Sequence, residues 1–290
     1  MKSRKFDVYA FADYSGSKFK KGQEKSIALS VICNDDEKPR TTKCYTRESL
    51  RYEILSLLTK ATQNDQRVIF GFDHSFSFPD GFYEVVTGNR WKTWEQLLDL
   101  LCFGTQGNQK LPSVNDEPRE WAKAANDCIC ERLNIKSGGP FWGHNFKYQE
   151  TDPEFFEKPT RLKEKRLTEE RCPKTKPIYK IGGKGTVGLQ SLYGIQHLAK
   201  LRYDLKDRGV KLFCWPFDGW DFPSSGHILV EMYPALANKK EKTDENDAEA
   251  CSIWLYEQDK ANTLIKWFNP NLDDDELRLA RLEGWILGVL

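Results

Sequence analysis

Short apolar runs separated by turn residues dominate the chain, and three of them end at or near an acid. Residues 6–13 and 67–73 are rich in β-branched and aromatic side chains, which predicts buried strands ending at Asp13 and Asp73. Residues 228–234 repeat the pattern and contain Glu231. An acid at the end of a buried strand costs free energy unless a cation compensates it. The recurrence therefore makes these strand ends the first candidates for chemistry.

The rest of the pattern predicts a mixed α/β protein. Further strands are expected at residues 25–33, 41–45, 178–181 and 210–215, and a Gly/Lys/Ser turn at 16–23. Apolar residues at helical spacing predict helices at residues 48–61, 91–103, 118–133, 189–201, 246–256 and 274–287. Three strands joined by short turns, a crossover helix and then a buried strand indicate a mixed sheet flanked by helices.

The pattern changes between residues 80 and 177, where helices alternate with Gly/Asn/Pro-rich loops. We therefore expect a core formed by residues 1–79 and 178–290, and a mostly helical insertion at 80–177 that includes a basic loop. Four tryptophans of this region, Trp91, Trp94, Trp121 and Trp142, predict a core for the insertion. The alternative is that they anchor a protein partner.

The overall composition does not indicate a function, but one segment of the chain is strongly basic. The chain has 44 Lys and Arg against 43 Asp and Glu, so net charge gives no argument for nucleic-acid binding. Residues 158–184 hold ten Lys or Arg against three acids, which indicates either a solvated face or a contact surface for phosphates.

Location is inferred from the cysteines and the apolar runs. The eight scattered cysteines are expected to be free thiols in a reducing compartment, since only Cys128 and Cys130 are close together. We find no signal peptide and no run of about 20 apolar residues, so we expect a cytoplasmic protein without a membrane partner.

The acids of the candidate site come from distant parts of the sequence: Asp13, Asp73, Glu231 and Asp247. If their strands are neighbours, the acids converge on one edge of the sheet and repel one another. Mg²⁺ or Mn²⁺ relieves such repulsion, and two ions about 3.5–4 Å apart can clamp a phosphodiester. The alternative is that each acid separately caps a turn or a helix, and Asp244 competes with Asp247 for the last place.

The order of these elements resembles the RNase H-like fold. More specifically, it resembles an uncharacterised bacterial family of RNase H-like proteins predicted to be nucleases. The segments that match are residues 71–79, 172–174, 181–195, 215–217, 230–234, 247–248 and 283–286. The resemblance implies a five-stranded mixed sheet with a mainly helical insertion after the fourth strand.

The same resemblance implies roles for single residues. Asp13, Asp73 and Asp247 would be metal ligands, and Glu231 a fourth ligand or an orienting acid. His74 would position water or bind phosphate, although a histidine beside an acid is more often its hydrogen-bond partner. Phosphate contacts would come from Lys184 and Gly185 in the glycine loop 182–188, and from Lys174 and Lys176 in the basic segment.

Three functions are compatible with these observations. The first is a Mg²⁺- or Mn²⁺-dependent phosphodiesterase acting on nucleic acid, with the acids as catalytic metal ligands. The second is an ATP-binding phosphotransferase or ATPase of the actin-like kind, because residues 13–17 resemble a phosphate-binding loop. The third is a non-catalytic module that binds a protein through the insertion. A shared fold does not decide among them.

Overall fold

The structure is a computed structural model that describes residues 5–105, 111–115, 117–135, 139–143, 162–183, 186–221 and 223–290. Its contacts divide the chain into two compact units. Unit 1 contains Met1–His74, His197–Asp273 and Trp285–Leu290, and unit 2 contains Ser75–Gln196 and Asp274–Gly284. The break after His74 lies near the domain boundary expected at 79/80, whereas the break after Gln196 does not coincide with the one expected at 177/178. The expected domains stay a prediction.

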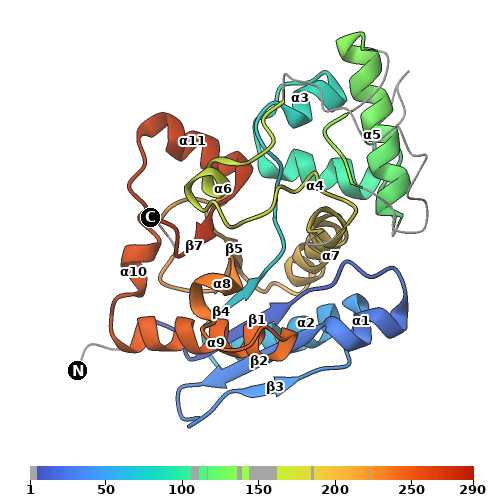
Figure 1. Cartoon of the computed structure of the whole chain (residues 1–290). Helices are drawn as coiled ribbons and strands as arrows, with labels where there is room; N and C mark the ends of the chain where they lie inside the picture. Colours follow the sequence, from blue (N-terminus) through green and yellow to red (C-terminus); the bar gives the residue numbers. More distant parts are fainter. Residues whose placement is uncertain are drawn as a thin grey trace. The chain divides into compact units, whose positions relative to one another are not determined.

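Unit 1 is built on a mixed sheet, which confirms the predicted α/β class (Figure 1). In the described part of the chain the sheet has seven strands, where five were expected. They are β1 (Val8–Asp13), β2 (Ala28–Cys33), β3 (Arg40–Thr42), β4 (Val68–Phe72), β5 (Leu212–Cys214), β6 (His227–Met232) and β7 (Ile286–Leu287). The spatial order is β3-β2-β1-β4-β6-β5, and β7 pairs with β6.

The strand directions follow from the connections. The strands β1, β2 and β3 form an antiparallel meander, as the short turns predict. The strands β4, β5, β6 and β7 run parallel to β1, and their carboxyl ends therefore share one edge of the sheet. This edge is where the sequence places its acids.

Helices cover both faces of this sheet. The helix α9 (Asp244–Lys260) packs on β1 and β2, where Ser30 and Ser252 are hydrogen-bonded at 2.8 Å (Figure 1). On the other face lies α2 (Arg47–Gln63), whose Thr62 is hydrogen-bonded to His227 at 2.8 Å. Thr46 caps α2, and its side chain accepts a hydrogen bond from the backbone N–H of Ser49, as a threonine directly before a helix commonly does.

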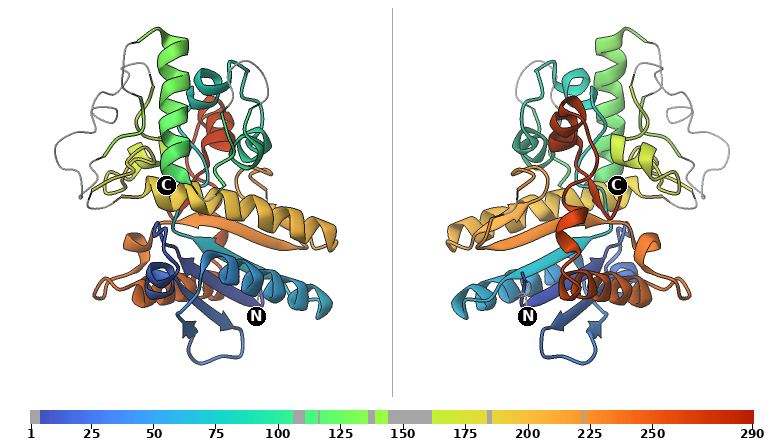
Figure 2. Two further views of the ribbon diagram at one scale, coloured as in Figure 1. Left: turned by 90° about the vertical axis from the view of Figure 1, so that its right-hand side faces the viewer. Right: turned by 90° about the vertical axis from the view of Figure 1, so that its left-hand side faces the viewer.

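The other helices of unit 1 are shorter and join these layers. They are α1 (Lys20–Ser26), α8 (Pro234–Ala237), α10 (Leu264–Trp267) and the last part of α7 (Gly188–Asp207), within which the unit boundary falls. Figure 2 shows the same helices and strands from two sides, in the colours of Figure 1.

Unit 2 is mainly helical in its described residues, as expected of the insertion. Its helices are α3 (Phe82–Thr87), α4 (Trp94–Phe103), α5 (Pro118–Leu133), α6 (Leu167–Arg171), the start of α7 and α11 (Asp274–Glu283). Trp91, Trp94 and Trp121 are at most 3% exposed, so they form its core rather than an accessible surface.

Three local predictions were wrong. The last helix, expected at residues 274–287, ends at Glu283, and Ile286–Leu287 form β7 instead. Residues 178–181 form a turn with one isolated bridge between Lys180 and Trp142 instead of a strand, because Tyr179 packs into a cluster of aromatic rings. Residues 20–26, expected in a turn and the start of a strand, form α1, whose Lys- and Gly-rich sequence lacks a clear apolar period.

Within the described residues, none of the helices has the length and apolar character needed to cross a membrane.

Candidate functional site

Asp13 and Asp73 lie side by side at the carboxyl ends of two neighbouring parallel strands. Asp13 is the last residue of β1, and Asp73 directly follows β4, whose Phe72 is in register with Ala12. The carboxyl groups of Asp13 and Asp73 are hydrogen-bonded to each other. The Asp73 carboxyl also accepts a hydrogen bond of 2.8 Å from the backbone N–H of Tyr14. The predicted convergence of these two acids is therefore present.

The start of α9 adds two more acids to the pair. Asp244 and Asp247 lie in the first turn of α9, whose N-cap is Thr243. Acids are favoured there because the exposed N–H groups of a helix N-terminus attract negative charge. Asp244 is hydrogen-bonded to Asp13, and the charges of both Asp244 and Asp247 act on Asp13. We call Asp13, Asp73, Asp244 and Asp247 the aspartate cluster.

The aspartate cluster is costly when all its members are ionised. Asp13 is only 7% exposed. Burial raises the pKa of Asp13 well above its usual value of 3.8, and the charge and hydrogen bond of Asp73 raise this pKa further, followed by the charges of Asp244 and Asp247. A hydrogen bond between two carboxyl groups requires that one of them keeps a proton, so Asp13 retains a proton more readily than an ordinary aspartate.

The solvent side of the cluster is partly neutralised. Burial raises the pKa of Asp244, while Lys43 and the hydrogen bond from Asp13 act in the opposite direction. The Lys43 ammonium lies 3.7 Å from Asp244 and 2.7 Å from Glu245. Each of these three side chains is at least 30% exposed, so the ion pairs are surface interactions worth at most about 1 kcal/mol.

The buried Cys251 thiol shows how closely the acids converge. Burial raises the pKa of Cys251 well above its usual value, and the charges of Asp73, Asp13 and Asp247 raise it further. Cys251 lies on α9 one helical turn after Asp247. Asp247 is held by Asn238, whose side-chain amide donates a hydrogen bond of 2.5 Å to its Oδ1.

Glu231 is placed differently from the other predicted ligands. It is in register with Phe72 of β4, which in turn is in register with Ala12 of β1. Side chains alternate along a strand, so Glu231 points to the sheet face opposite to that of Asp13. Glu231 is only 3% exposed. The structure thus brings Asp13, Asp73, Asp244 and Asp247 together and places Glu231 on the other face.

His74 follows Asp73 but is packed among aromatic rings. Its ring stacks on Phe72 with centroids 5.2 Å apart and lies 4.9 Å from the ring of Tyr14. The side chain is 1% exposed. This position fixes the chain directly after Asp73, and water does not reach the ring freely.

The predicted phosphate contacts lie outside this cluster or outside the described residues. Lys174 and Lys176 are exposed in unit 2. Lys184 and Gly185 lie outside the described residues, as do residues 158–161 of the basic segment.

The donor set of the aspartate cluster suits a hard divalent cation. Carboxylate oxygens are the ligands that Mg²⁺ and Mn²⁺ prefer, and a cation would remove the mutual repulsion that raises the pKa of Asp13. In the part of the chain that the structure describes, no three acidic, His or Cys side chains are spaced as a formed metal site. Burial and the neighbouring carboxyl groups raise the pKa of Asp13, so binding a cation would displace a proton from this group.

The groups that position this site were not predicted from the sequence. The guanidinium of Arg47 is 4% exposed and donates hydrogen bonds to the carbonyls of Ser15 (3.1 Å) and Ser17 (2.7 Å). It thereby fixes the loop that follows Asp13. One signal was available: Arg47 is the first residue of α2, where a positive charge opposes the helix dipole, so a role outside the helix was to be expected.

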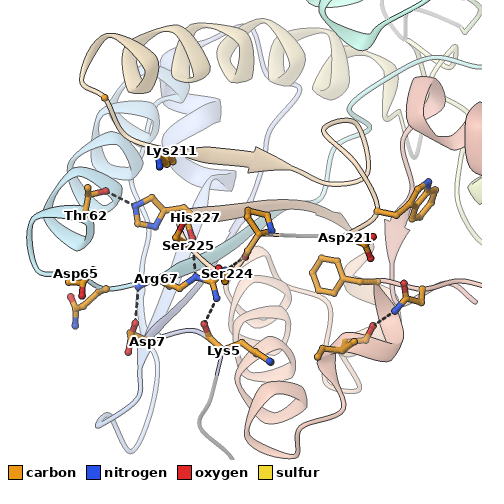
Figure 3. Close-up of a pocket in the computed structure, with 18 residues that line it drawn as sticks. Lys5, Asp7, Thr62, Asp65, Arg67, Lys211, Asp221, Ser224, Ser225 and His227 are labelled. Atoms are coloured by element: carbon orange, nitrogen blue, oxygen red, sulfur yellow. Dashed lines mark hydrogen bonds between the residues drawn. The ribbon is translucent and has the colours of Figure 1, made fainter.

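The opposite end of the sheet holds a cavity of about 930 Å³ (Figure 3). Arg67 closes part of it by donating hydrogen bonds to the carbonyls of Lys5, Pro223 and Gly226. The other charged residues of its lining are Lys5, Lys211, Asp7, Asp65 and Asp221. Cations and acids are thus equal in number, which gives no field of one sign for a phosphate ligand. None of the predicted site residues lines this cavity.

Comparison of the chain with models of protein families, with curated proteins and with solved structures found no match.

Proposed function

We propose that the protein is a divalent-metal-dependent phosphodiesterase that cleaves nucleic acid at the aspartate cluster. The observation that supports this most directly is the hydrogen-bonded contact of Asp13 with Asp73 and Asp244 at the carboxyl end of the parallel strands. Buried acids that face one another have no structural benefit at neutral pH, whereas a bound cation turns their repulsion into attraction. We include Mg²⁺ or Mn²⁺ in the proposal as the cofactor.

We also assign the sheet of unit 1 to the RNase H-like class as part of this proposal. Support comes from the sequence of elements: an antiparallel meander, a crossover helix, a parallel strand followed by an acid, and a late helix that begins with acids. This is the order on which the resemblance of the sequence rests. The connection from β1 to β2 contains α1 and is not the tight hairpin expected of an actin-like phosphate loop, so we prefer a nuclease to an ATPase.

In this proposal Asp13, Asp73, Asp244 and Asp247 hold the cation. The metal would polarise the phosphodiester and lower the pKa of a bound water. The residues of the chain supply a fixed geometry: the Tyr14 N–H orients the Asp73 carboxylate, Asn238 orients Asp247, and Arg47 holds the loop after Asp13. Glu231 would act from the other face of the sheet, and His74 would fix the chain directly after Asp73.

The test is cleavage of labelled single- and double-stranded DNA and RNA oligonucleotides with EDTA, Mg²⁺ or Mn²⁺. We expect metal-dependent cleavage that falls by at least about a hundredfold in Asp13→Asn and Asp73→Asn, since losing even an outer-shell partner of a metal ligand costs 10–100-fold. The matched control is Asp35→Asn, an exposed aspartate in the β2–β3 turn at the other end of β1. Undiminished cleavage in both site variants would refute the proposal.

Metal binding can be measured independently of cleavage. A cation that binds only the folded state stabilises it by about 2.7 kcal/mol when present at a hundred times its Kd. We therefore expect millimolar Mn²⁺ to raise the melting temperature of the wild type and of Asp35→Asn, but not of Asp73→Asn. If the melting temperature of the wild type does not change, the acids do not form a cation site.

A further inference from the structure

An exposed phenylalanine lies on the loop that leaves the aspartate cluster. Phe19 is 76% exposed, which is the highest value among the large hydrophobic residues of the described chain. It is the N-cap residue of α1, yet its side chain makes no capping hydrogen bond. Ser, Thr, Asp or Asn would stabilise the helix at this position by about 1 kcal/mol. Folding therefore gives no reason for a phenylalanine at position 19.

The backbone around Phe19 is held firmly. The carbonyl of Phe19 accepts a hydrogen bond of 3.2 Å from the Ser17 hydroxyl, and the Lys18 carbonyl accepts one of 3.3 Å from the Gln23 side chain. A Cβ atom at Gly22 would lie 2.1 Å from Oγ of Ser17, so only glycine allows this close approach. The ring of Phe19 is thus presented to solvent from a fixed loop.

Lysines flank Phe19 in the sequence. Residues 18–25 contain four lysines and one glutamate, whereas the whole chain has a net charge of only +1. Lys20 lies 3.8 Å from Glu24. Lys21 and Lys25 are four residues apart, hence on one face of α1, and both are exposed. We call Phe19, Lys20, Lys21 and Lys25 the Phe19 patch.

The Phe19 patch lies within reach of the aspartate cluster. Phe19 follows Asp13 by six residues, and six residues of extended chain span at most about 20 Å. The aspartate cluster repels phosphate groups, so a nucleic-acid strand needs positive charge next to the cluster in order to approach it. The lysines of the patch supply positive charge on the segment that directly follows Asp13.

We propose that the Phe19 patch binds single-stranded nucleic acid, with a base stacked on the ring of Phe19 and the adjoining phosphates on the lysines. The inference rests on the proposed nuclease function and specifies its substrate as a single strand. An unpaired base exposes the flat face that a phenylalanine ring can stack on, whereas the bases of a duplex are already stacked on one another. Lysine ammonium groups contact the backbone without regard to sequence.

Binding of fluorescent oligonucleotides, followed by anisotropy in EDTA, tests this without cleavage. For a 12-nucleotide strand we expect Phe19→Ala to weaken binding about tenfold, as alanine substitutions of base-stacking aromatic residues do, and Phe19→Tyr to bind like the wild type. The matched control is Phe103→Ala, which removes a phenylalanine of 69% exposure in unit 2 and is expected to have no effect.

The salt dependence of binding distinguishes the contribution of the lysines from that of the Phe19 ring. Replacing Lys20, Lys21 and Lys25 together by alanine is expected to reduce the slope of log K against log salt concentration by about 2, since each contact to a single strand contributes about 0.7. The control triple variant replaces the exposed lysines Lys60, Lys92 and Lys206. It is expected to keep the slope of the wild type.

The outcomes distinguish this inference from the proposed function. Equal binding by the wild type, Phe19→Ala and the patch triple variant would refute the Phe19 patch, even if cleavage depends on Asp13. Equal or tighter binding of the matching duplex would also refute it, because stacking on Phe19 requires an unpaired base. Patch-dependent binding by a protein that cleaves nothing in Mg²⁺ or Mn²⁺ would leave the binding surface standing and refute the nuclease.

Discussion

Two groups of buried acids, one in each unit, differ in what their carboxyl groups face. In unit 2, Glu169 and Glu283 are 1% and 0% exposed, and they surround the fully buried Arg166. In unit 1, Asp13 is nearly as buried but faces other carboxyl groups. Buried charge is tolerated when partners of opposite charge or hydrogen-bond donors surround it. The first group contains such partners, whereas the second needs a cation from solution.

The acids of unit 2 are matched by donors of the chain itself. Arg166 donates from Nε and Nη2 to Oε1 of Glu169, each at 3.0 Å. One oxygen of Glu283 accepts from the Asp80 N–H at 2.6 Å, and the other accepts from the Leu167 N–H at 2.7 Å. Burial raises the pKa of Glu283 to about 7, and these N–H groups and Arg166 hold it from rising further. The buried acids of unit 2 therefore join segments of the chain that are distant in sequence.

The largest effect that separates the two groups is expected from Arg166→Met. It leaves Glu169 buried without its cation, and breaking a buried ion pair in this way costs about 3–5 kcal/mol. We expect a loss of this size in the free energy of unfolding of the unit 2 transition, measured by urea denaturation. The control is Arg171→Ala, whose pair with Glu276 at 2.6 Å is more than a quarter exposed and contributes at most about 1 kcal/mol. Equal losses in the two variants would contradict a special role for the buried pair.

The next effect is expected from Glu283→Gln, which changes an acid to its amide. Each oxygen of Glu283 accepts from a different backbone N–H, and a glutamine provides only one oxygen. One buried N–H then faces an NH₂ group, which costs about 1–3 kcal/mol. The measurement is the same urea titration at pH 8, where the wild-type carboxylate is ionised. A variant as stable as the wild type would show that these two hydrogen bonds are dispensable.

The contrast also shows how far the sequence predicts the fold and the site. Asp13 and Asp73 were predictable because a local signal marks them: an apolar run that stops at an acid. The mixed sheet, the helices α2, α4 and α5 and the cap at Thr46 follow from equally local patterns. In these cases the hydrophobic period of a single segment decides its structure.

What the sequence did not predict depends on pairing between distant segments. The strand containing Glu231 was predicted, but its sheet face depends on the register with β4, and a shift of one residue reverses every side chain. Arg166 bonds to the hydroxyl of Ser75 and the carbonyl of Glu283, which lie 91 and 117 residues away. Asp244 was considered as an alternative to Asp247, and the structure brings both to Asp13.

The smallest effect, and the one of opposite sign, is expected from Asp13→Asn without metal. The substitution removes a charge that the neighbouring acids repel, so the variant should be more stable than the wild type in EDTA at pH 8. A gain of about 0.5–2 kcal/mol is usual when a destabilised functional residue is replaced. The same chemical change, from acid to amide, thus stabilises unit 1 and destabilises unit 2. A less stable Asp13→Asn protein would place Asp13 with the structural acids.

The pH dependence of this gain follows from the direction of the shift. The pKa of Asp13 is higher in the folded than in the unfolded protein, so the folded state binds the proton more tightly. Folding of the wild type is therefore favoured as the pH falls below the raised pKa of Asp13 toward the usual value of 3.8, and this stability is lost as the pH rises.

The Asp13→Asn variant lacks this pH-dependent contribution to the free energy of unfolding, while Glu283 contributes equally to both proteins. We expect the advantage of the variant to shrink as urea titrations in EDTA are repeated from pH 8 down to pH 5, and to grow again when the pH is restored. A difference that stays constant over this range would mean that Asp13 does not titrate against its neighbours, and the acids would then be too far apart to share a cation.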